Sequence, residues 1–229
     1  MSPPRAARAR ACAAALAVVV SLCAAHGPAQ ATKPRPKATA KQQAPTKERS
    51  TGIPYAERAD AMRAADDIAE RRNLDRAWVR EAIGSARLLP QITRWVLPPS
   101  AGTAKNWRVY RSRFIDPVRI AAGVAFWQTH ADTLERAERE FGVPAAIIVG
   151  IIGVETIYGR DVGNFRVMDA LATLSFDFPD AHPRASERRV FFQNELEQLL
   201  SLAQRSGTNP LSFKGSYAGA MGLPQFMPS

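Results

Sequence analysis

Apolar side chains recur every three or four residues along much of the chain, which is the spacing of an amphipathic helix. This pattern predicts one helix over residues 55–72 and a second over 75–87, with an aspartate as the N-cap at its first position. A longer helix is predicted over 117–141, interrupted near Gly123 and ended by Gly142.

The segment over residues 90–116 lacks this helical spacing. It combines several prolines with three large aromatic residues, Trp95, Trp107 and Tyr110. Proline fixes φ and has no backbone N–H, so it interrupts regular structure. We therefore expect an irregular packed connection here.

The most apolar segment begins at Val143-Pro144 and extends to Val154. A helix that is apolar nearly all round belongs in the centre of a domain. Two further helices are predicted, one over 166–176 and one from an N-cap at Ser186 to Gly207. In the last helix the residues expected to face inward are Val190, Phe191, Leu196, Leu199, Leu200 and Leu202. No segment has a convincing strand period, so a mainly α-helical domain is predicted.

One acidic residue, Glu155, stands at the end of the most apolar helix, and the nearest base along the chain is Arg160. Burial without a cationic partner raises the pKa of a carboxyl group, and a carboxyl that keeps its proton near neutrality can protonate a glycosidic oxygen. Gly153 and Gly159 favour this catalytic interpretation because small residues let a bulky ligand approach. A structural glutamate at the solvent edge of the helix end is the alternative.

Glycoside hydrolases usually place a second carboxylate opposite the acid. The candidates are Asp161, Asp169, Asp177 and Asp180. Asp161 is expected to pair locally and Asp169 to serve the N-terminal half of its own helix. None stands in an apolar context like that of Glu155, so the sequence indicates one working carboxyl group rather than two.

Residues 1–31 have the pattern of a secretory signal peptide. Three arginines precede an apolar stretch over 11–25, and the small residues of 29–31 offer a cleavage site. The apolar stretch is shorter than the roughly 20 residues that span a bilayer, and an uncleaved N-terminal anchor is the alternative. The pattern predicts export to the periplasm.

Both cysteines, Cys12 and Cys23, lie inside the predicted signal peptide. The mature protein would then have no disulfide and no cysteine-ligated metal. Cys23 is also a candidate for lipid attachment, which would make the protein an outer-membrane lipoprotein. Lipoprotein cleavage sites have a small residue directly before the cysteine, and here that residue is Leu22. Lipidation is therefore the weaker interpretation.

Residues 32–52 are rich in Lys, Pro and Ala, which predicts a disordered basic linker before a folded domain over 53–229. The whole chain has 31 basic and 21 acidic residues, a net charge of +10. A basic exported protein meets the anionic polymers of the cell wall first. The arginines are spread along the chain without a base-reading motif, so nucleic acid is not the expected partner.

Two long segments carry a family resemblance. Residues 142–179, GVPAAIIVGIIGVETIYGRDVGNFRVMDALATLSFDFP, and 210–229, PLSFKGSYAGAMGLPQFMPS, resemble the lytic murein transglycosylase B family. The resemblance implies a lysozyme-like helical domain in which the Glu of Gly-Val-Glu-Thr, here Glu155, is the single catalytic acid and base. It implies non-hydrolytic cleavage between N-acetylmuramic acid and N-acetylglucosamine, leaving 1,6-anhydromuramoyl ends. The substrate is then the peptidoglycan glycan strand, and no cofactor is implied.

The second segment contains small residues that would admit a sugar close to the backbone. Ser216 and Gln225 could supply hydrogen bonds, and Tyr217 or Phe226 a stacking face. In the family this segment lines the cleft, with the serine and the glutamine near the catalytic acid. Met221 is a further candidate contact, although core packing is an equal alternative for Met221 and for Phe226.

Four more residues are candidates for substrate contact. Arg188 and Arg189 match a basic pair that in the family faces the peptide-bearing side of the substrate, and a solvated helix N-terminus is the alternative for them. Tyr158 and Asn164 lie close to Glu155 in sequence and are candidates for sugar contact.

The chain stops at Ser229, whereas the family continues with further cleft tyrosines and often a calcium-binding loop. We therefore expect a domain that is incomplete at its C-terminus, with any calcium site in the absent part and no metal site here. Apolar side chains left uncovered should form a patch. Those expected in it are Ile147, Ile151, Phe191 and Leu199.

Two other functions remain open from the sequence. A hydrolytic muramidase would need a second carboxylate or a positioned water, and a non-catalytic wall-binding fragment would bind without turnover. For the lytic enzyme a monomer is expected, and proteins of cell-wall synthesis are candidate partners.

Overall fold

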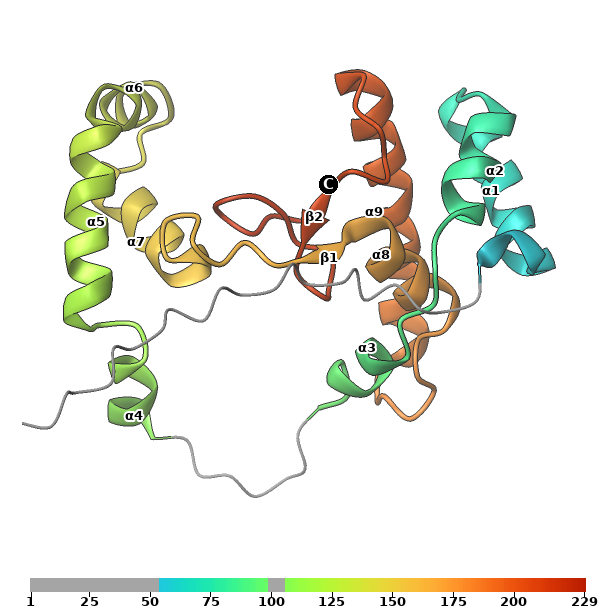
Figure 1. Cartoon of the computed structure of the whole chain (residues 1–229), viewed down its shortest axis with the longest axis horizontal. Helices are drawn as coiled ribbons and strands as arrows, with labels where there is room; N and C mark the ends of the chain where they lie inside the picture. Colours follow the sequence, from blue (N-terminus) through green and yellow to red (C-terminus); the bar gives the residue numbers. More distant parts are fainter. Residues whose placement is uncertain (1–53, 99–105) are drawn as a thin grey trace, which may run out of the picture. The chain divides into compact units, whose positions relative to one another are not determined.

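The computed structural model describes residues 54–98 and 106–229 (Figure 1). The signal peptide and the linker predicted over 1–52 lie outside these ranges and stay predictions. The described part is mainly α-helical, as the sequence predicted. Its helices are η1 (Tyr55–Glu57), α1 (Ala59–Arg72), α2 (Arg76–Gly84), α3 (Pro90–Trp95), α4 (Trp107–Ser112), α5 (Pro117–Thr129), α6 (Ala131–Phe141), α7 (Ala145–Thr156), α8 (Val167–Phe176) and α9 (Ala185–Ser206). The two short strands, β1 (Phe165–Arg166) and β2 (Lys214–Gly215), pair antiparallel.

None of the helices in residues 54–98 and 106–229 combines the length and the apolar character that a membrane crossing requires.

The larger hydrophobic core is built by α1, α2, α3, α8 and α9. Every residue of α8 from Val167 to Ser175 is buried, and the helix packs chiefly on α9. Leu171 of α8 and Leu199 of α9 have no exposed surface. The centre of this part of the molecule is therefore α8, and not the more apolar α7 that the sequence pattern favoured.

A second, smaller cluster holds α5, α6 and α7 together (Figure 1). Its buried members are only Leu134, Ala145 and Val149. On α7, Ile147 is 54% exposed and Ile151 is 44% exposed. The predicted central position of α7 is therefore wrong for the described residues, because no described element packs on that face.

The expected apolar patch is confirmed in part. Ile147 and Ile151 are exposed as predicted, but Leu199 is fully buried and Phe191 packs against the larger core. The two residues that depart from the expectation lie on α9, which packs extensively against α8.

Several predicted helix ends are confirmed and others shift. The Asp75 side chain accepts a hydrogen bond from the backbone N–H of Trp78 at 2.7 Å, as expected of an N-cap. The long helix over 117–141 breaks at His130 and not near Gly123, which stays inside α5. Gly142 ends α6 with φ of 70°.

At the start of α9, Ser186 is the second helical residue and does not cap it. Arg184 occupies the N-cap position, and its side chain pairs with Glu187 instead. Gly207 ends the helix with φ of 62°, as predicted. Val190, expected to face inward, is exposed.

The connection predicted over 90–116 contains two short helices, α3 and α4, and residues 99–105 lie outside the described ranges. Trp95, Trp107 and Tyr110 are all exposed. The aromatic rings are thus not packed inward, and that part of the prediction is wrong. Trp107 and Tyr110 stack on each other, one turn apart on α4.

The α1 and α9 helices are joined by a charged cluster around Glu197. Its carboxylate accepts hydrogen bonds from Arg71, at 2.8 Å, and from Arg72. Burial is the largest single influence and raises the pKa of Glu197, but the hydrogen bonds and the positive charges of the two arginines together lower that pKa below its usual range. A carboxyl group whose pKa is lowered by folding stabilises the folded state only while it is ionised.

Glu197→Gln should therefore lower the free energy of unfolding by about 1–2 kcal/mol at pH 7, because both arginines lose a charged acceptor. The difference between variant and wild type should shrink as the pH falls through the folded-state pKa of Glu197, where the wild type loses the same charge. Urea unfolding of both proteins at several pH values measures this. A difference that grows on acidification would contradict the assignment.

Candidate active site

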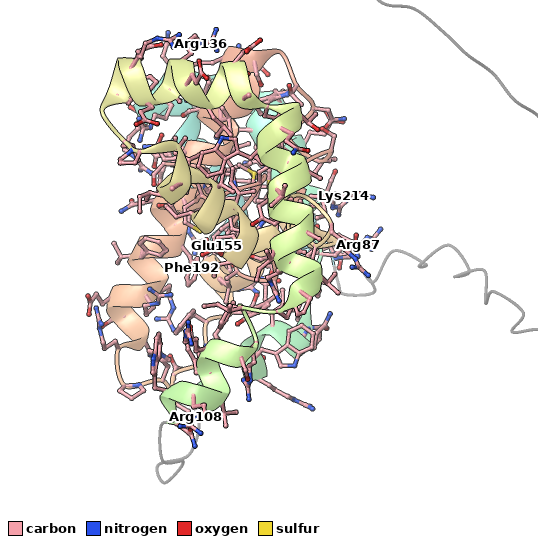
Figure 2. All side chains as sticks on the ribbon, turned by 90° about the vertical axis from the view of Figure 1, so that its left-hand side faces the viewer. Arg87, Arg108, Arg136, Glu155, Phe192 and Lys214 are labelled. Carbon is pink, nitrogen blue, oxygen red and sulfur yellow. The ribbon has the colours of Figure 1, made fainter. Side chains whose placement is uncertain are left out.

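Glu155 lies near the C-terminal end of α7, next to α5 (Figure 2). The helix ends at Thr156, and the next three residues, 157–159, have positive φ values of 50°, 58° and 89°. Ile157 is β-branched, a residue type that rarely adopts this conformation, and such strain persists only where surrounding contacts enforce it. The acid therefore sits directly before a sharp, enforced reversal of the chain.

The first of these contacts is made by Tyr158, whose ring is inserted between α5 and α7. A Cβ atom on Gly123 would lie 2.9 Å from the ring carbon Cζ of Tyr158, and one on Gly153 would lie 2.7 Å from it. The Tyr158 ring also packs on Phe126, with centroids 5.3 Å apart. Neither helix could therefore carry a side chain where it meets this ring.

The two glycines near Glu155 thus have a packing role that the sequence analysis did not predict. Gly153 makes room for Tyr158, and a Cβ on Gly159 would lie 2.9 Å from Leu223 Cδ2. Both accommodate side chains of the same chain, and the approach of a ligand beside them stays a prediction. Tyr158 itself acquires a packing role, and its predicted sugar contact stays a prediction.

Thr156 makes the second contact. Its side chain is buried, and its hydroxyl donates to the carbonyl oxygen of Leu223 at 2.9 Å while accepting from the backbone N–H of Gly159 at 3.0 Å. One hydroxyl group therefore closes the reversal after Glu155 and joins it to residues 210–229, the second motif of the family resemblance.

Two further contacts bring the motifs together. Gln225, itself at φ of 54°, donates through Nε2 to the carbonyl oxygens of Val162, at 3.2 Å, and Gly222, at 2.9 Å. Gly163, at φ of 85°, approaches the backbone of Gly215 too closely to carry a side chain. Residues 155–165 and 214–226, predicted to share one site, are thus in direct contact.

Arg119 of α5 was missed by the sequence analysis. Its Nε donates to the carbonyl oxygen of Gly153 at 3.2 Å, in the last turn of α7, and its Nη1 donates to the carbonyl oxygen of Arg113 at 2.6 Å. Hydrogen bonds from Arg119, above all from its backbone N–H, lower the pKa of the N-cap Asp116. A cation at the C-terminal end of α7 is also favoured by the helix dipole.

The Glu155 side chain is exposed. Within the described ranges, no hydrogen bond or ion pair holds its carboxylate. The enclosed apolar surroundings expected from the sequence are therefore absent, because the neighbouring apolar side chains of α7 also face outward. The acid is presented on an open face of the helix and is fixed only through the backbone around it.

Three of the four candidate second carboxylates are engaged in structural contacts. Asp169 is buried and pairs with Arg166, Asp177 accepts from Tyr55 and Arg58, and Asp180 pairs with Arg189. As predicted, Asp169 lies in the first turn of its helix, but its carboxylate also accepts from the backbone N–H of Arg87, which lies outside that helix.

Asp161 is the remaining candidate. Its side chain is exposed, and the predicted local partner is not found among residues 54–98 and 106–229, although its backbone N–H donates to the carbonyl oxygen of Thr156.

In the second motif, Ser216 supports its own turn. Its hydroxyl oxygen accepts from the backbone N–H groups of Ala218, at 3.3 Å, and Ala220, at 3.1 Å. Met221 is half-buried against the larger core, which is the alternative that the sequence left open. Phe226 is exposed and is not part of that core.

Arg188 and Arg189 are both half-buried near the N-terminus of α9. The Arg188 guanidinium lies over the ring of Phe192 at 5.1 Å, and Arg189 donates to the carbonyl oxygen of Phe178 and to Asp180. Neither arginine is simply solvated, and no contact with α7 is found among the described residues. Asn164 is exposed just before β1.

Potential metal ligands do not gather in this part of the chain. Across residues 54–98 and 106–229, no group of three or more His, Cys, Asp or Glu side chains is arranged to hold an ion.

Known proteins resemble this chain over most of the described part. A profile of the family described as Transglycosylase SLT domain matches residues 57–229. Membrane-bound lytic murein transglycosylase B of Escherichia coli (strain K12) is 40% identical over 186 residues, covering 78% of this chain and 50% of that protein. The chain thus spans about half the length of this curated relative.

Solved structures agree with this similarity. The soluble lytic transglycosylase SltB1 from Pseudomonas aeruginosa is 45% identical, with a TM-score of 0.67 over 74% of this chain and 54% of that one. SltB3 from the same organism, solved in complex with NAG-anhNAM-pentapeptide, is 25% identical, with a TM-score of 0.60 over 72% of this chain and 43% of that one. The lysozyme-like helical fold expected from the sequence is thereby confirmed.

The Tyr158 contact predicts opposite effects for two glycines of the same helix. Gly153→Ala should lower the free energy of unfolding by about 1–3 kcal/mol, because the new methyl group overlaps the Tyr158 ring. Gly150→Ala, where a Cβ meets nothing within 4 Å, should instead raise it by about 0.5–1 kcal/mol. Urea unfolding measures both. Equal effects of the two substitutions would show that Tyr158 does not constrain α7.

The Thr156 hydroxyl should be needed for stability because two backbone groups depend on it. Thr156→Val keeps the shape but leaves the Leu223 carbonyl and the Gly159 N–H without this partner, at a cost of about 1–3 kcal/mol. Thr156→Ser retains the hydroxyl and should stay closer to wild type. Thermal unfolding compares the three proteins, and a serine variant no more stable than the valine variant would argue against the hydrogen bonds.

Proposed function

The chain belongs to the transglycosylase SLT domain family, and from this membership we propose that it cleaves the β-1,4 bond between MurNAc and GlcNAc in peptidoglycan without water, with Glu155 as the catalytic acid and base. The observation that carries the proposal is the placement of Glu155. Its carboxyl group is free of structural ion pairs among the described residues, while the backbone on either side of it is fixed by Tyr158 and Thr156.

The reaction needs only one carboxyl group. Protonated Glu155 donates its proton to the glycosidic oxygen as the bond from that oxygen to C1 of MurNAc breaks. The resulting carboxylate then takes the proton from the C6 hydroxyl of the same MurNAc, and the C6 oxygen bonds to C1. The products are a GlcNAc hydroxyl end and a 1,6-anhydro-MurNAc end, and Glu155 has recovered its proton.

The other carboxylates support this assignment. Asp169 and Asp177 are held in ion pairs that stabilise the fold, and Asp180, whose side chain is 93% exposed, pairs with Arg189 at the surface. This leaves Asp161 as the candidate for a hydrolytic mechanism. Because acid, base and nucleophile all come from Glu155 and the substrate, we propose no cofactor.

A general acid at neutral pH needs surroundings less polar than water. Glu155 is exposed in the free chain, so in this proposal the bound glycan strand covers it. The exposed apolar residues Ile151 and Val154 on the same helix would lie under the sugar rings and help to exclude water.

The second motif is proposed to hold the strand. Ser216 keeps a hydroxyl proton for a sugar oxygen, because its oxygen only accepts in its bonds from Ala218 and Ala220. Gln225 uses its amide N–H groups within the chain, so its carbonyl oxygen is available to a sugar hydroxyl. Asn164 and Phe226 are exposed and accessible to substrate.

The remaining predictions belong to the same proposal. We propose cell-wall remodelling in the periplasm, by a monomer released after cleavage that follows residue 31. Arg188 and Arg189 would face the stem peptide from the N-terminal end of α9. The whole chain carries a net charge of +10, and the part after residue 31 keeps 28 basic and 21 acidic residues, a charge of +7 that supports association with the anionic wall.

Glu155→Gln tests the proposal because it removes the proton and keeps the shape. Turnover of purified sacculi should fall by at least about 100-fold, while wall binding is retained. Asp161→Asn is the matched control and should keep wild-type turnover. Mass spectrometry of the products identifies the chemistry, since anhydro ends are lighter than reducing ends by one water.

Three outcomes would contradict the proposal. Retention of more than about a tenth of the activity by Glu155→Gln would remove Glu155 from the chemistry. Reducing ends together with loss of activity in Asp161→Asn would indicate a hydrolytic muramidase. Wall binding by the wild type with no release of muropeptides would indicate a binding module.

A further inference from the structure

Two large aromatic side chains near the second motif remain at the surface. Trp95, the last residue of α3, is 48% exposed, and Tyr217, directly after Ser216, is 39% exposed. Their rings meet edge to face, with centroids 5.5 Å apart and planes at 79°. Phe165 of β1 contacts Trp95 in the same way at 5.9 Å. We call Trp95, Tyr217 and Phe165 the aromatic corner.

The Trp95 side of the corner is held by a rigid support. The short α3 helix begins with Pro90, its Ile92 is fully buried in the larger core, and the Thr93 hydroxyl donates to the Pro90 carbonyl oxygen at 2.8 Å. These contacts fix the backbone up to Thr93, two residues before Trp95. The ring therefore projects from a preformed element.

The Tyr217 side is fixed equally well. Phe165 and Gly215 are partners in the β1–β2 pair, and the turn that carries Tyr217 is closed by a hydrogen bond from the Ser216 backbone N–H to the Ala220 carbonyl oxygen at 2.8 Å. Gly219, at φ of 90°, packs against Leu171 of the larger core. Both walls of the corner are thus in place before any ligand arrives.

Such a corner suits a sugar ring. The carbon-bound hydrogens of a pyranose form an apolar face that packs on an aromatic ring, and the negative face of the aromatic ring attracts their partial positive charge. Two rings at nearly a right angle offer one face for stacking and a second wall that limits sideways movement. A rigid ring also loses little side-chain entropy on binding.

We propose that the aromatic corner binds a pyranose ring of the glycan strand, with Trp95 as the stacking surface. It rests on the proposed function, because the turn that carries Tyr217 also carries Ser216 and is joined to the Glu155 segment through Gly163 and Gly215. Trp95 is a positioning residue for a sugar and takes no part in proton transfer. If the aromatic corner instead bound a protein partner, chitohexaose binding would not depend on Trp95.

The test uses the full chain carrying Glu155→Gln, so that binding is measured without turnover. Chitohexaose is the probe, and its Kd is measured by calorimetry together with tryptophan emission. Trp95→Ala should raise the Kd about threefold to tenfold and abolish the change in emission on binding. Trp95→Phe, which keeps an aromatic face, should retain most of the affinity. Trp107→Ala removes another exposed tryptophan, 71% exposed on α4, and should leave the Kd unchanged.

The results separate this proposal from the proposed function. An unchanged Kd in Trp95→Ala, equal weakening by Trp95→Ala and Trp95→Phe, or no chitohexaose binding at all would each overturn the aromatic corner, even if wild-type protein releases anhydro-muropeptides. A Kd that depends on Trp95 in the expected order would support the corner, even if wild-type protein cleaved no sacculi.

Discussion

The placement of Glu155 depends on one contact, in which the Tyr158 ring occupies space that would otherwise hold side chains of α5 and α7. Gly123 and Gly153 meet this ring from the two helices, and the ring leaves no room for a Cβ on either. Tyr158 can reach this position only because the chain turns through left-handed conformations after the acid. Helix packing and the turn therefore depend on each other, and together they fix where the carboxyl group projects.

The features that the sequence predicted well have local causes. The N-cap at Asp75 and the helix ends at Gly142 and Gly207 are set by the conformations that one or two residues allow. Helical spacing likewise located α1 and α8 closely. The position of Glu155 near a helix end belongs to this class, because it follows from the length of the apolar run before it.

What the sequence could not supply depends on partners far along the chain. Thr156 meets Leu223 across 67 positions, and Arg119 meets Gly153 across 34. Single threonines and arginines are too common for their spacing to indicate such pairs. The prediction that α7 is buried failed for a related reason. Its composition shows how much apolar surface the helix carries, but the surface is covered only where another element packs against it.

The bond between Thr156 and Leu223 also sets an order of events during biosynthesis. A polypeptide emerges N-terminus first, from the ribosome and, in an exported chain, across the membrane, so α7 and its acid appear before the residues that anchor them. Long-range contacts of this kind form late, after the local helices. The hydroxyl of Thr156 finds its acceptor only once residue 223 has emerged as well, and until then the acid lies on a helix whose end is not yet fixed.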